Sequence, residues 1–216
     1  MWEGKNVTVF VSGGIAAFKA ATLVRLFVKA GANVEVAMTK SACEFITPLT
    51  FQVLTKNKVH TDTFDEDEAD RVQHIHLADK TDVAVVVPAT ANTIAKLANG
   101  IADNFVTSTL LAITAPIYVA PAMNEHMWEN PATVRNVAQL KADGKMVIEP
   151  ATGFLAEGYN GKGRLPEPEE IFEQVTFFES RREYKSPLEG KTILITAGGT
   201  KERIDPVRYI SNDSSG

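Results

Sequence analysis

Short apolar runs that alternate with longer helical patterns constrain the fold of this 216-residue chain more than any other feature. The apolar runs predict strands at residues 7–11, 34–38, 83–87, 117–120 and 146–149. Helical patterns separate or follow them at residues 15–30, 45–54, 93–98, 105–113, 131–142 and 169–179. Because strands separated by helices form parallel sheets covered on both faces, we expect an α/β fold with a doubly wound parallel sheet.

The chain is long enough for one complete domain and the start of another. Residues 1–180 are predicted to form the complete domain, since a domain of this size buries enough apolar surface to fold without disulfides or structural metal ions. The polar segment 181–190 is predicted to be a linker. A new apolar run at 191–196 predicts a strand, and a glycine-rich turn follows it. Residues 191–216 are therefore expected to be the truncated start of a second domain.

Composition argues against several classes of partner and site. A net charge of −5 without a basic cluster argues against nucleic acid, and no apolar run is long enough to span a bilayer. The N-terminus does not look like a signal peptide, and the single Cys43 cannot form a disulfide within the chain, so we expect a cytoplasmic protein. The acidic run 65–68 reads as a solvated loop. His74 and His76, considered as a pair on a strand, lack a third ligand, so no metal site is predicted.

A glycine turn follows the first strand and opens a helix; it consists of Ser12, Gly13, Gly14, Ile15 and Ala16. Backbone N–H groups and the helix dipole at such a turn bind phosphate. The second strand ends in Thr39 and Lys40, a hydroxyl and a cation, whereas a nicotinamide dinucleotide site has a carboxylate there for the ribose. The pattern favours the single phosphate of FMN over NAD, although glycines also open helices of this kind without any ligand.

Two later strands end in related motifs. One is Pro88-Ala89-Thr90-Ala91-Asn92-Thr93, and the other is Pro121-Ala122-Met123-Asn124 followed by Met127-Trp128. Because the loops after the carboxyl ends of parallel strands line one crevice, we expect the two motifs to share a site. A proline, an uncharged amide and large apolar side chains suit the wall of an aromatic cofactor. For Met127 and Trp128, plain core packing is the alternative interpretation.

These motifs, together with His74-Ile75-x-Leu77, resemble the flavin-containing cysteine decarboxylases over residues 5–178. In particular they are similar to the members of coenzyme A biosynthesis that convert 4′-phosphopantothenoylcysteine to 4′-phosphopantetheine. The resemblance implies a flavodoxin-like or Rossmann-like fold, FMN as cofactor, and assembly into homotrimers or dodecamers with FMN between subunits. Residues 205–216 resemble the opening of a phosphopantothenate–cysteine ligase domain, but this tail is too short for ligase activity.

The resemblance also implies roles for individual residues. His74 would be the catalytic base, and Asn124 would hold the substrate carboxylate. A flap within residues 151–168 would close over substrate; by composition alone this glycine-rich segment could equally be an edge connection. The substrate would contact Asn124, Met127, Ala156 and Gly158. The cofactor would contact Ser12, Gly13, Gly14, Ile15, Ala16, Thr39, Lys40, Pro88, Ala89, Thr90, Ala91, Asn92 and Met123.

One residue departs from the family. In the coenzyme A members the flap reads Ala-Cys-Gly, and the cysteine protonates the enethiol during the reductive half-reaction. Here the same place reads Ala156-Glu157-Gly158. We therefore expect an intact oxidative half-reaction, with Glu157 in the acid position and a reductive half-reaction that lacks the family's cysteine. The alternatives are a flavin prenyltransferase, which would lack the Met123–Trp128 pattern, and a non-catalytic regulatory subunit, which would carry long acidic extensions.

Overall fold

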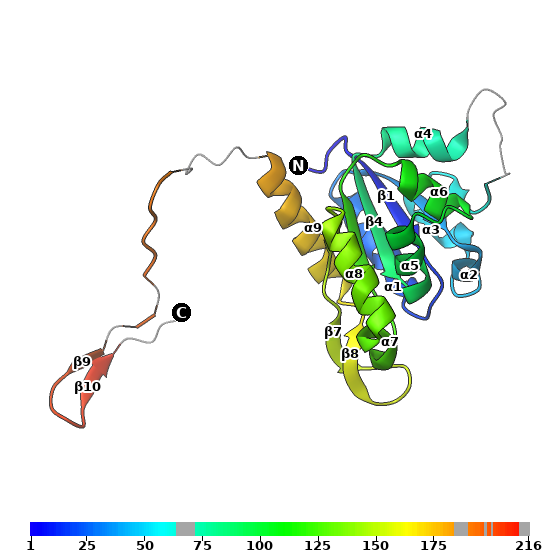
Figure 1. Cartoon of the computed structure of the whole chain (residues 1–216). Coiled ribbons are helices and arrows are strands. Elements are labelled where there is room, and N and C mark those ends of the chain that lie inside the picture. The colour runs from blue at the N-terminus through cyan, green and yellow to red at the C-terminus, as the bar shows by residue number, and fades with distance from the viewer. Residues whose placement is uncertain (64–71, 184–189, 197, 200, 212–216) are drawn as a thin grey trace. The chain divides into compact units, whose positions relative to one another are not determined.

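The computed structural model describes residues 1–63, 72–183, 190–196, 198–199 and 201–211. They form two compact units, Met1–Ser180 and Arg181–Gly216 (Figure 1). The acidic run 65–68, much of the predicted linker and parts of the second glycine turn lie outside the described residues.

The first unit is built on a parallel sheet with the strand order β3-β2-β1-β4-β5-β6. Its strands are β1 (Asn6–Val11), β2 (Asn33–Met38), β3 (Val59–His60), β4 (Val83–Ala89), β5 (Ile117–Pro121) and β6 (Met146–Val147). The predicted doubly wound fold is confirmed, and the order is the Rossmann type. The chain reverses direction of winding between β1 and β4, and a crevice opens beyond the carboxyl ends of strands at such a point.

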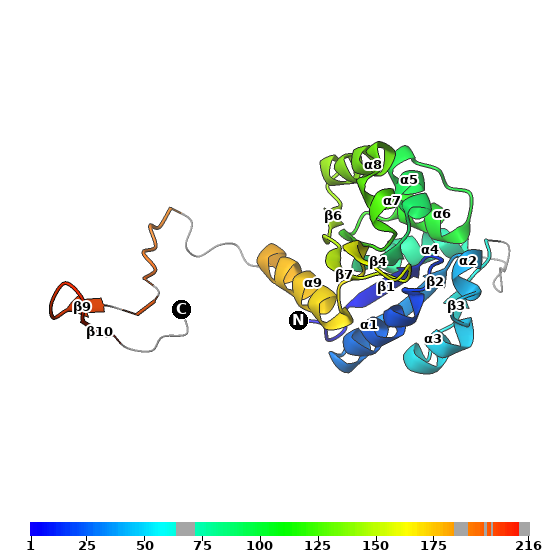
Figure 2. The same ribbon diagram turned by 90° about the horizontal axis from the view of Figure 1, so that it is seen from below.

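Helices cover both faces of this sheet (Figure 2). One face carries α1 (Ala17–Lys29), α3 (Pro48–Thr55) and α9 (Pro168–Glu183). The other carries α4 (Gln73–Lys80), α5 (Ala91–Asn99), α6 (Phe105–Ala112) and α8 (Pro131–Ala142). Alternate residues of each strand feed the two cores: Val9 packs in the first and Phe10 in the second, and both are fully buried. This double burial explains the nearly continuous apolar runs.

Several local predictions were wrong. The helix α4, on which His74 and His76 lie, was not predicted; Leu77 and Ala78 bury one of its faces. The helix predicted from residue 45 begins at Pro48, whose fixed φ suits a first helical turn. The short helices α2 (Lys40–Cys43) and α7 (Glu125–Glu129) were not predicted.

The glycine-rich segment after β6 forms an antiparallel hairpin of β7 (Ala151–Phe154) and β8 (Asn160–Arg164), where no regular structure was predicted. In the second unit, the described residues 191–196 are not a strand, contrary to prediction, and Leu194 is 87% exposed. An apolar run forms a strand only where neighbouring strands accept its hydrogen bonds. That unit instead contains the small hairpin of β9 (Lys201–Arg203) and β10 (Tyr209–Ser211). No helix within the described ranges has the length and apolar character needed to cross a membrane.

Candidate functional site

Ser12 ties the end of β1 to the end of β4. Its Oγ donates to the carbonyl oxygen of Pro88 at 2.7 Å and accepts from the backbone N–H of Thr90 at 3.0 Å. The residue is only 1% exposed, so these hydrogen bonds of its hydroxyl are buried within the protein. The glycine turn is thereby held against the first strand-end motif, as expected from two strand ends that share one crevice.

Backbone hydrogen bonds extend this connection to the second motif and the hairpin. The N–H of Ala122 donates to the carbonyl of Ala89 at 3.1 Å, and the N–H of Met123 donates to the carbonyl of Gly163 at 3.0 Å. The ends of β1, β4 and β5 therefore lie side by side, and β8 is attached to them. Four segments that are far apart in the sequence form one surface.

A cavity of about 570 Å³ opens at this place, within the size range of small-molecule and cofactor sites. Twelve of the predicted site residues line it: Gly13, Gly14, Ile15, Ala16, Pro88, Thr90, Ala91, Met123, Asn124, Met127, Ala156 and Glu157. The other lining residues had no predicted contact of their own, although Ala122 belongs to the second motif and the last five to the predicted flap; they are Phe18, Lys19, Ala122, Phe154, Leu155, Gly163, Arg164 and Leu165.

The glycine turn forms one end of the cavity. A Cβ on Gly13 would lie 2.4 Å from Cβ of Ser41, so only glycine allows this approach. At Gly14 the nearest described atom would be Cγ2 of Thr90 at 3.8 Å. Helix α1 begins after the turn with no side-chain cap among the described residues; the N–H groups of Ala17 and Lys19 donate to the carbonyls of Gly14 and Ala16 at 2.9 and 3.0 Å. Ser41 was missed in the sequence, although it follows directly on Thr39-Lys40 at the end of β2.

Several predicted residues are not part of the cavity lining that the described residues form: Ser12, Thr39, Lys40, Ala89, Asn92, Gly158 and His74. The hydroxyl of Thr39 caps α2 by accepting from the N–H of Ala42 at 3.1 Å. The ammonium of Lys40 lies 3.8 Å from the Asp62 carboxylate, and Asn92 is exposed. Ser12 and Ala89 support the cavity through the bonds given above. Direct roles for all seven as ligands stay predictions.

A carboxylate organises the cationic side of the cavity. Nζ of Lys19 lies 2.9 Å, and Nη2 of Arg164 2.6 Å, from Oε1 of Glu167. The hydrogen bond from Lys19 is the main reason that the pKa of Glu167 lies below its usual value. These contacts join α1 to the end of β8 and to the segment between β8 and α9.

Asn124 links the loop after β5 to the hairpin. Its Oδ1 accepts from the N–H of His126 at 2.9 Å and caps α7. Its Nδ2 donates to Oε1 of Glu157 at 3.0 Å and to the hydroxyl of Tyr159 at 2.9 Å. The amide therefore faces the tip of the hairpin, and the two residues predicted to be catalytic, Asn124 and Glu157, are in direct contact.

Glycines allow the hairpin to dock closely. The Glu125 carboxylate accepts from the N–H of Lys162 at 3.0 Å, and a Cβ on Gly161 would lie 2.8 Å from Cδ of that glutamate. A Cβ on Gly163 would lie 2.2 Å from the carbonyl oxygen of Met123. Nearby, Trp128 packs partly buried against the second core, as the alternative interpretation held, whereas Met127 is 49% exposed and lines the cavity.

His74 lies at the beginning of α4. Its ring meets the edge of Phe105 with a centroid distance of 6.4 Å, and its buried Nδ1 has no hydrogen-bond partner among the described residues. A buried ring nitrogen without a hydrogen-bond partner is rare in a folded protein and indicates a candidate functional residue. Within one copy of the chain, the structure does not bring His74 to the cavity lining.

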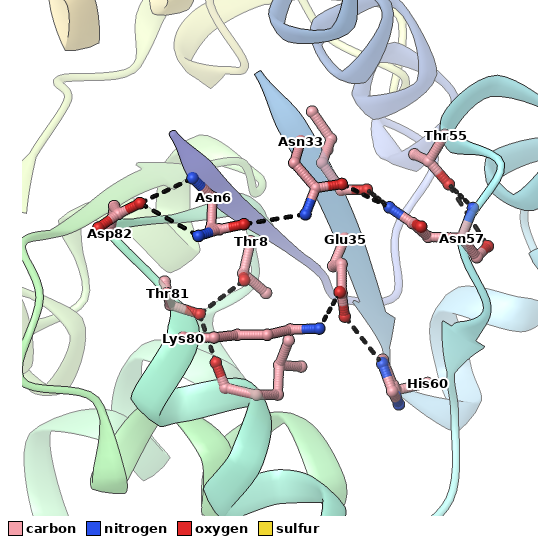
Figure 3. Close-up of polar contacts among 12 residues, drawn as sticks. Asn6, Thr8, Asn33, Glu35, Thr55, Asn57, His60, Lys80, Thr81 and Asp82 are labelled. Carbon is pink, nitrogen blue, oxygen red and sulfur yellow. Dashed lines mark hydrogen bonds and ion pairs between the residues drawn. The ribbon is translucent and has the colours of Figure 1, made fainter. Parts of the chain in front are cut away.

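A polar network fixes the other end of α4 to the sheet (Figure 3). The Glu35 carboxylate on β2 accepts from Nζ of Lys80 and from Nε2 of His60, the latter at 3.2 Å. Burial works to raise the pKa of Glu35, but these hydrogen bonds outweigh it and the pKa lies below its usual value. His60 also stacks on Phe105 at 5.0 Å, the same ring that His74 meets. The network thus positions the surroundings of His74.

Comparison with known proteins matches the first unit to the family model described as Flavoprotein, over residues 1–178. Residues 188–216 match the model of the DNA/pantothenate metabolism flavoprotein C-terminal domain. The coenzyme A biosynthesis bifunctional protein CoaBC of Bacillus subtilis (strain 168) is 54% identical over 216 residues, which are 100% of this chain and 53% of that protein. CoaBC of Mycobacterium tuberculosis (strain H37Rv) is 48% identical over 98% of this chain and 50% of its own length. The chain thus spans about half the length of these relatives.

Solved structures with a similar fold belong to related proteins. A mutant of PPC decarboxylase, complexed with pantothenoylaminoethenethiol, has a TM-score of 0.74 and 34% identity, covering 82% of this chain and 100% of its own. The FMN binding protein AtHal3 has a TM-score of 0.71 and 36% identity, covering 83% of this chain and 98% of its own.

Proposed function

Because the chain belongs to the Flavoprotein family, we propose that its first unit binds FMN in the cavity and decarboxylates 4′-phosphopantothenoylcysteine in coenzyme A biosynthesis. The observation that carries this proposal is the meeting of the glycine turn and both strand-end motifs around one cavity at the point where the sheet reverses its winding. The relatives named CoaBC and the solved PPC decarboxylase support the choice of substrate. Ligase activity is not proposed for residues 191–216.

The residues present fit FMN. The cavity has the volume of a cofactor site, and its walls include the apolar side chains of Ile15, Met123 and Met127. The N-terminal turn of α1 supplies backbone donors for a phosphate, and the approach of Ser41 to Gly13 places a hydroxyl-bearing residue beside it. Pro88, Thr90 and Ala91 would hold the ring system from the end of β4.

Bound FMN would supply an electron acceptor that allows the cysteinyl carbon–sulfur unit to be oxidised to a thioaldehyde, from which CO2 leaves readily. Asn124 would hold the substrate carboxylate through its amide N–H groups. An amide orients this group without adding a positive charge, which would oppose loss of CO2. The exposed apolar face of Phe154 on the hairpin would exclude water from the closed site.

His74 would take the proton in the oxidative half-reaction. Because it is absent from the lining that the described residues form, we propose that it reaches the cavity of a neighbouring copy in a homotrimer or dodecamer. Exposed apolar side chains beside it, Val72 at 50% and Ile75 at 42%, support a contact surface at this end of α4. Mixing inactive His74→Asn chains with inactive Asn124→Ala chains should restore activity, because some sites would then combine both intact residues. Mixtures that stay inactive would contradict a shared site.

Glu157 occupies the position of the cysteine in the related coenzyme A enzymes, 3.0 Å from the amide of Asn124. We propose that the chain completes the oxidative half and forms the enethiol, but little saturated product. The solved PPC decarboxylase mutant is complexed with an aminoethenethiol, which supports an enethiol as a ligand of this fold. Replacing Glu157 by Cys should restore the reductive half.

Anaerobic incubation with 4′-phosphopantothenoylcysteine tests the proposed function. The flavin absorbance should bleach and CO2 should be released, while mass spectrometry should find a product two hydrogens lighter than 4′-phosphopantetheine. A flavin that stays oxidised at saturating substrate would disprove the decarboxylase assignment. Efficient formation of the saturated thiol would show that Glu157 or another group serves as the acid.

A further inference from the structure

The amide of Asn124 has both of its N–H groups engaged by the hairpin. One Nδ2 contact goes to the Glu157 carboxylate at 3.0 Å and the other to the Tyr159 hydroxyl at 2.9 Å. The amide cannot offer donors elsewhere by flipping, because its Oδ1 accepts from the N–H of His126 at 2.9 Å and this bond caps α7. A carboxylate that binds Asn124 must therefore replace one of these partners.

We propose that the Glu157 carboxylate stands in for the substrate carboxylate on Asn124, which makes Glu157 a specificity-determining residue that a carboxylate-bearing ligand must displace. This inference rests on the proposed function, since that function places the substrate carboxylate on Asn124. It adds a role for Glu157 in binding, before any proton transfer. A ligand without the carboxylate does not compete for the amide and binds without this cost.

The hairpin allows the displacement. Glu157 is exposed at the turn, and next to it Gly158 has a φ of +91° with no described atom within 4 Å of a Cβ built there. The strands remain docked through separate contacts, the N–H of Lys162 on Glu125 and the N–H of Met123 on Gly163. The Glu157 side chain can leave Asn124 while the rest of the hairpin stays in place.

The nearby cations do not remove the competition. Lys162 pairs with Glu149 at 3.2 Å, while Lys19 and Arg164 share Glu167. A second carboxylate at Asn124 therefore meets the negative charge of Glu157 without a free cation from these three residues. For a partly exposed pair, losing a charge-assisted hydrogen bond and adding repulsion weakens binding by roughly tenfold.

Two ligands that cannot be oxidised separate this effect from turnover. 4′-Phosphopantothenoylserine keeps the carboxylate but has a hydroxyl in place of the thiol, and 4′-phosphopantothenoylethanolamine lacks the carboxylate as well. Calorimetry on the FMN-loaded chain measures both affinities. Glu157→Gln should tighten the serine ligand by about tenfold and leave the ethanolamine ligand within about twofold. Glu157→Ala, which also removes the hydrogen bond, should tighten the serine ligand at least as much.

Glu149→Gln is the matched control. It removes one negative charge beside the same hairpin, but its carboxylate contacts Lys141 and Lys162 instead of Asn124. It should change neither affinity, because Lys162 also lies over the Trp128 ring at 5.9 Å and is not part of the cavity lining that the described residues form. Equal tightening of both ligands by Glu157→Gln, or no tightening, would overturn the inference, and weakening would show that Glu157 helps substrate to bind. The proposed function fails separately, if 4′-phosphopantothenoylcysteine does not reduce the flavin of the parent chain.

Discussion

The two sides of the cavity are held together in different ways. The floor, formed by residues 12–16 and 88–91, rests on the buried Ser12 hydroxyl and on the ends of central strands. The hairpin β7–β8 lies opposite, and its tip is fixed by the contact of exposed Glu157 with Asn124. Segments with buried backbone bonds open rarely, whereas exposed tips open easily. The difference fits the proposal that the floor binds the cofactor and that the hairpin adjusts to the substrate.

His74 belongs to neither region, so it provides the largest test of their separation. His74→Asn should lower the rate of flavin reduction by substrate by roughly 10²–10⁴, the usual contribution of a catalytic base. FMN content and assembly size should not change, because the residues predicted to contact the flavin come from other segments and Val72 and Ile75 of the proposed contact surface are kept. Stopped-flow absorbance measures the rate, and mass photometry measures the assembly.

His76→Asn is the control on the same helix, and its side chain is exposed. It should react at the parent rate. If His76→Asn is inactive while His74→Asn reacts normally, the assignment of the base is wrong. If His74→Asn loses its FMN, the base and the cofactor site are not separate.

The next largest effect is expected on the floor. In Gly13→Ala the new Cβ would lie 2.4 Å from Cβ of Ser41 and 2.8 Å from its carbonyl carbon, so the turn must shift. Overpacking of this kind costs about 1–3 kcal/mol, which would weaken FMN binding by roughly tenfold to a hundredfold. Fluorescence titration of the apoprotein with FMN measures the affinity.

Gly14→Ala tests whether the strain is specific. The new methyl group would meet only Cγ2 of Thr90 at 3.8 Å, an ordinary contact. It should lower FMN affinity less than Gly13→Ala. An equal loss in both variants would mean that occupation of the cavity, and not the approach of Ser41, determines the effect.

The sequence predicted much of the floor, because its determinants are local. Apolar runs identified the central strands, and the residues after Val11 and Val87 were predicted to share a crevice because parallel strands end on the same side of a sheet. Thr39 shows the limit of this argument. Its chemistry suits a phosphate, but its hydroxyl caps α2, and that short helix has no clear signal in the sequence.

Other features depend on partners that are distant in the chain. Gly161 and Gly163 lie in a segment for which no regular structure was predicted. Their role is evident only in the structure, where Glu125 and Met123 lie against them. His74 was selected by resemblance to the family. The sequence alone could not predict that His74 lies outside the cavity lining that the described residues form. The apolar run 191–196 was predicted as a strand, but in the described residues it lacks strands to pair with.

A smaller effect is expected for the hairpin. In Gly163→Ala the Cβ would lie 2.2 Å from the Met123 carbonyl oxygen, at a φ of +146° that disfavours other residues. The hairpin would move away from the loop after β5, and the substrate concentration for half-maximal flavin reduction should rise by about tenfold, while FMN binding stays unchanged. Gly158→Ala introduces backbone strain without a described atom in contact, so its effect should be weaker. Loss of FMN from Gly163→Ala would break the division between floor and hairpin.

The smallest effect should come from Glu35, which contacts neither region in the structure. Its pKa is lowered, so its contribution to the free energy of unfolding is fully present above its ordinary value of 4.5 and is lost as the pH falls through the lower folded-state pKa. Glu35→Gln removes the charge but keeps an acceptor for Lys80 and His60. Urea unfolding at pH 7 should show a loss of about 1–2 kcal/mol, and the difference from the parent should shrink as the pH falls below that value. Asp103→Asn breaks the exposed pair with Lys96 and should change stability less.

FMN affinity and the half-saturating substrate concentration should remain those of the parent in Glu35→Gln. A change in either would show that the network around α4 reaches the cavity, and the floor and the hairpin would then not be its only determinants.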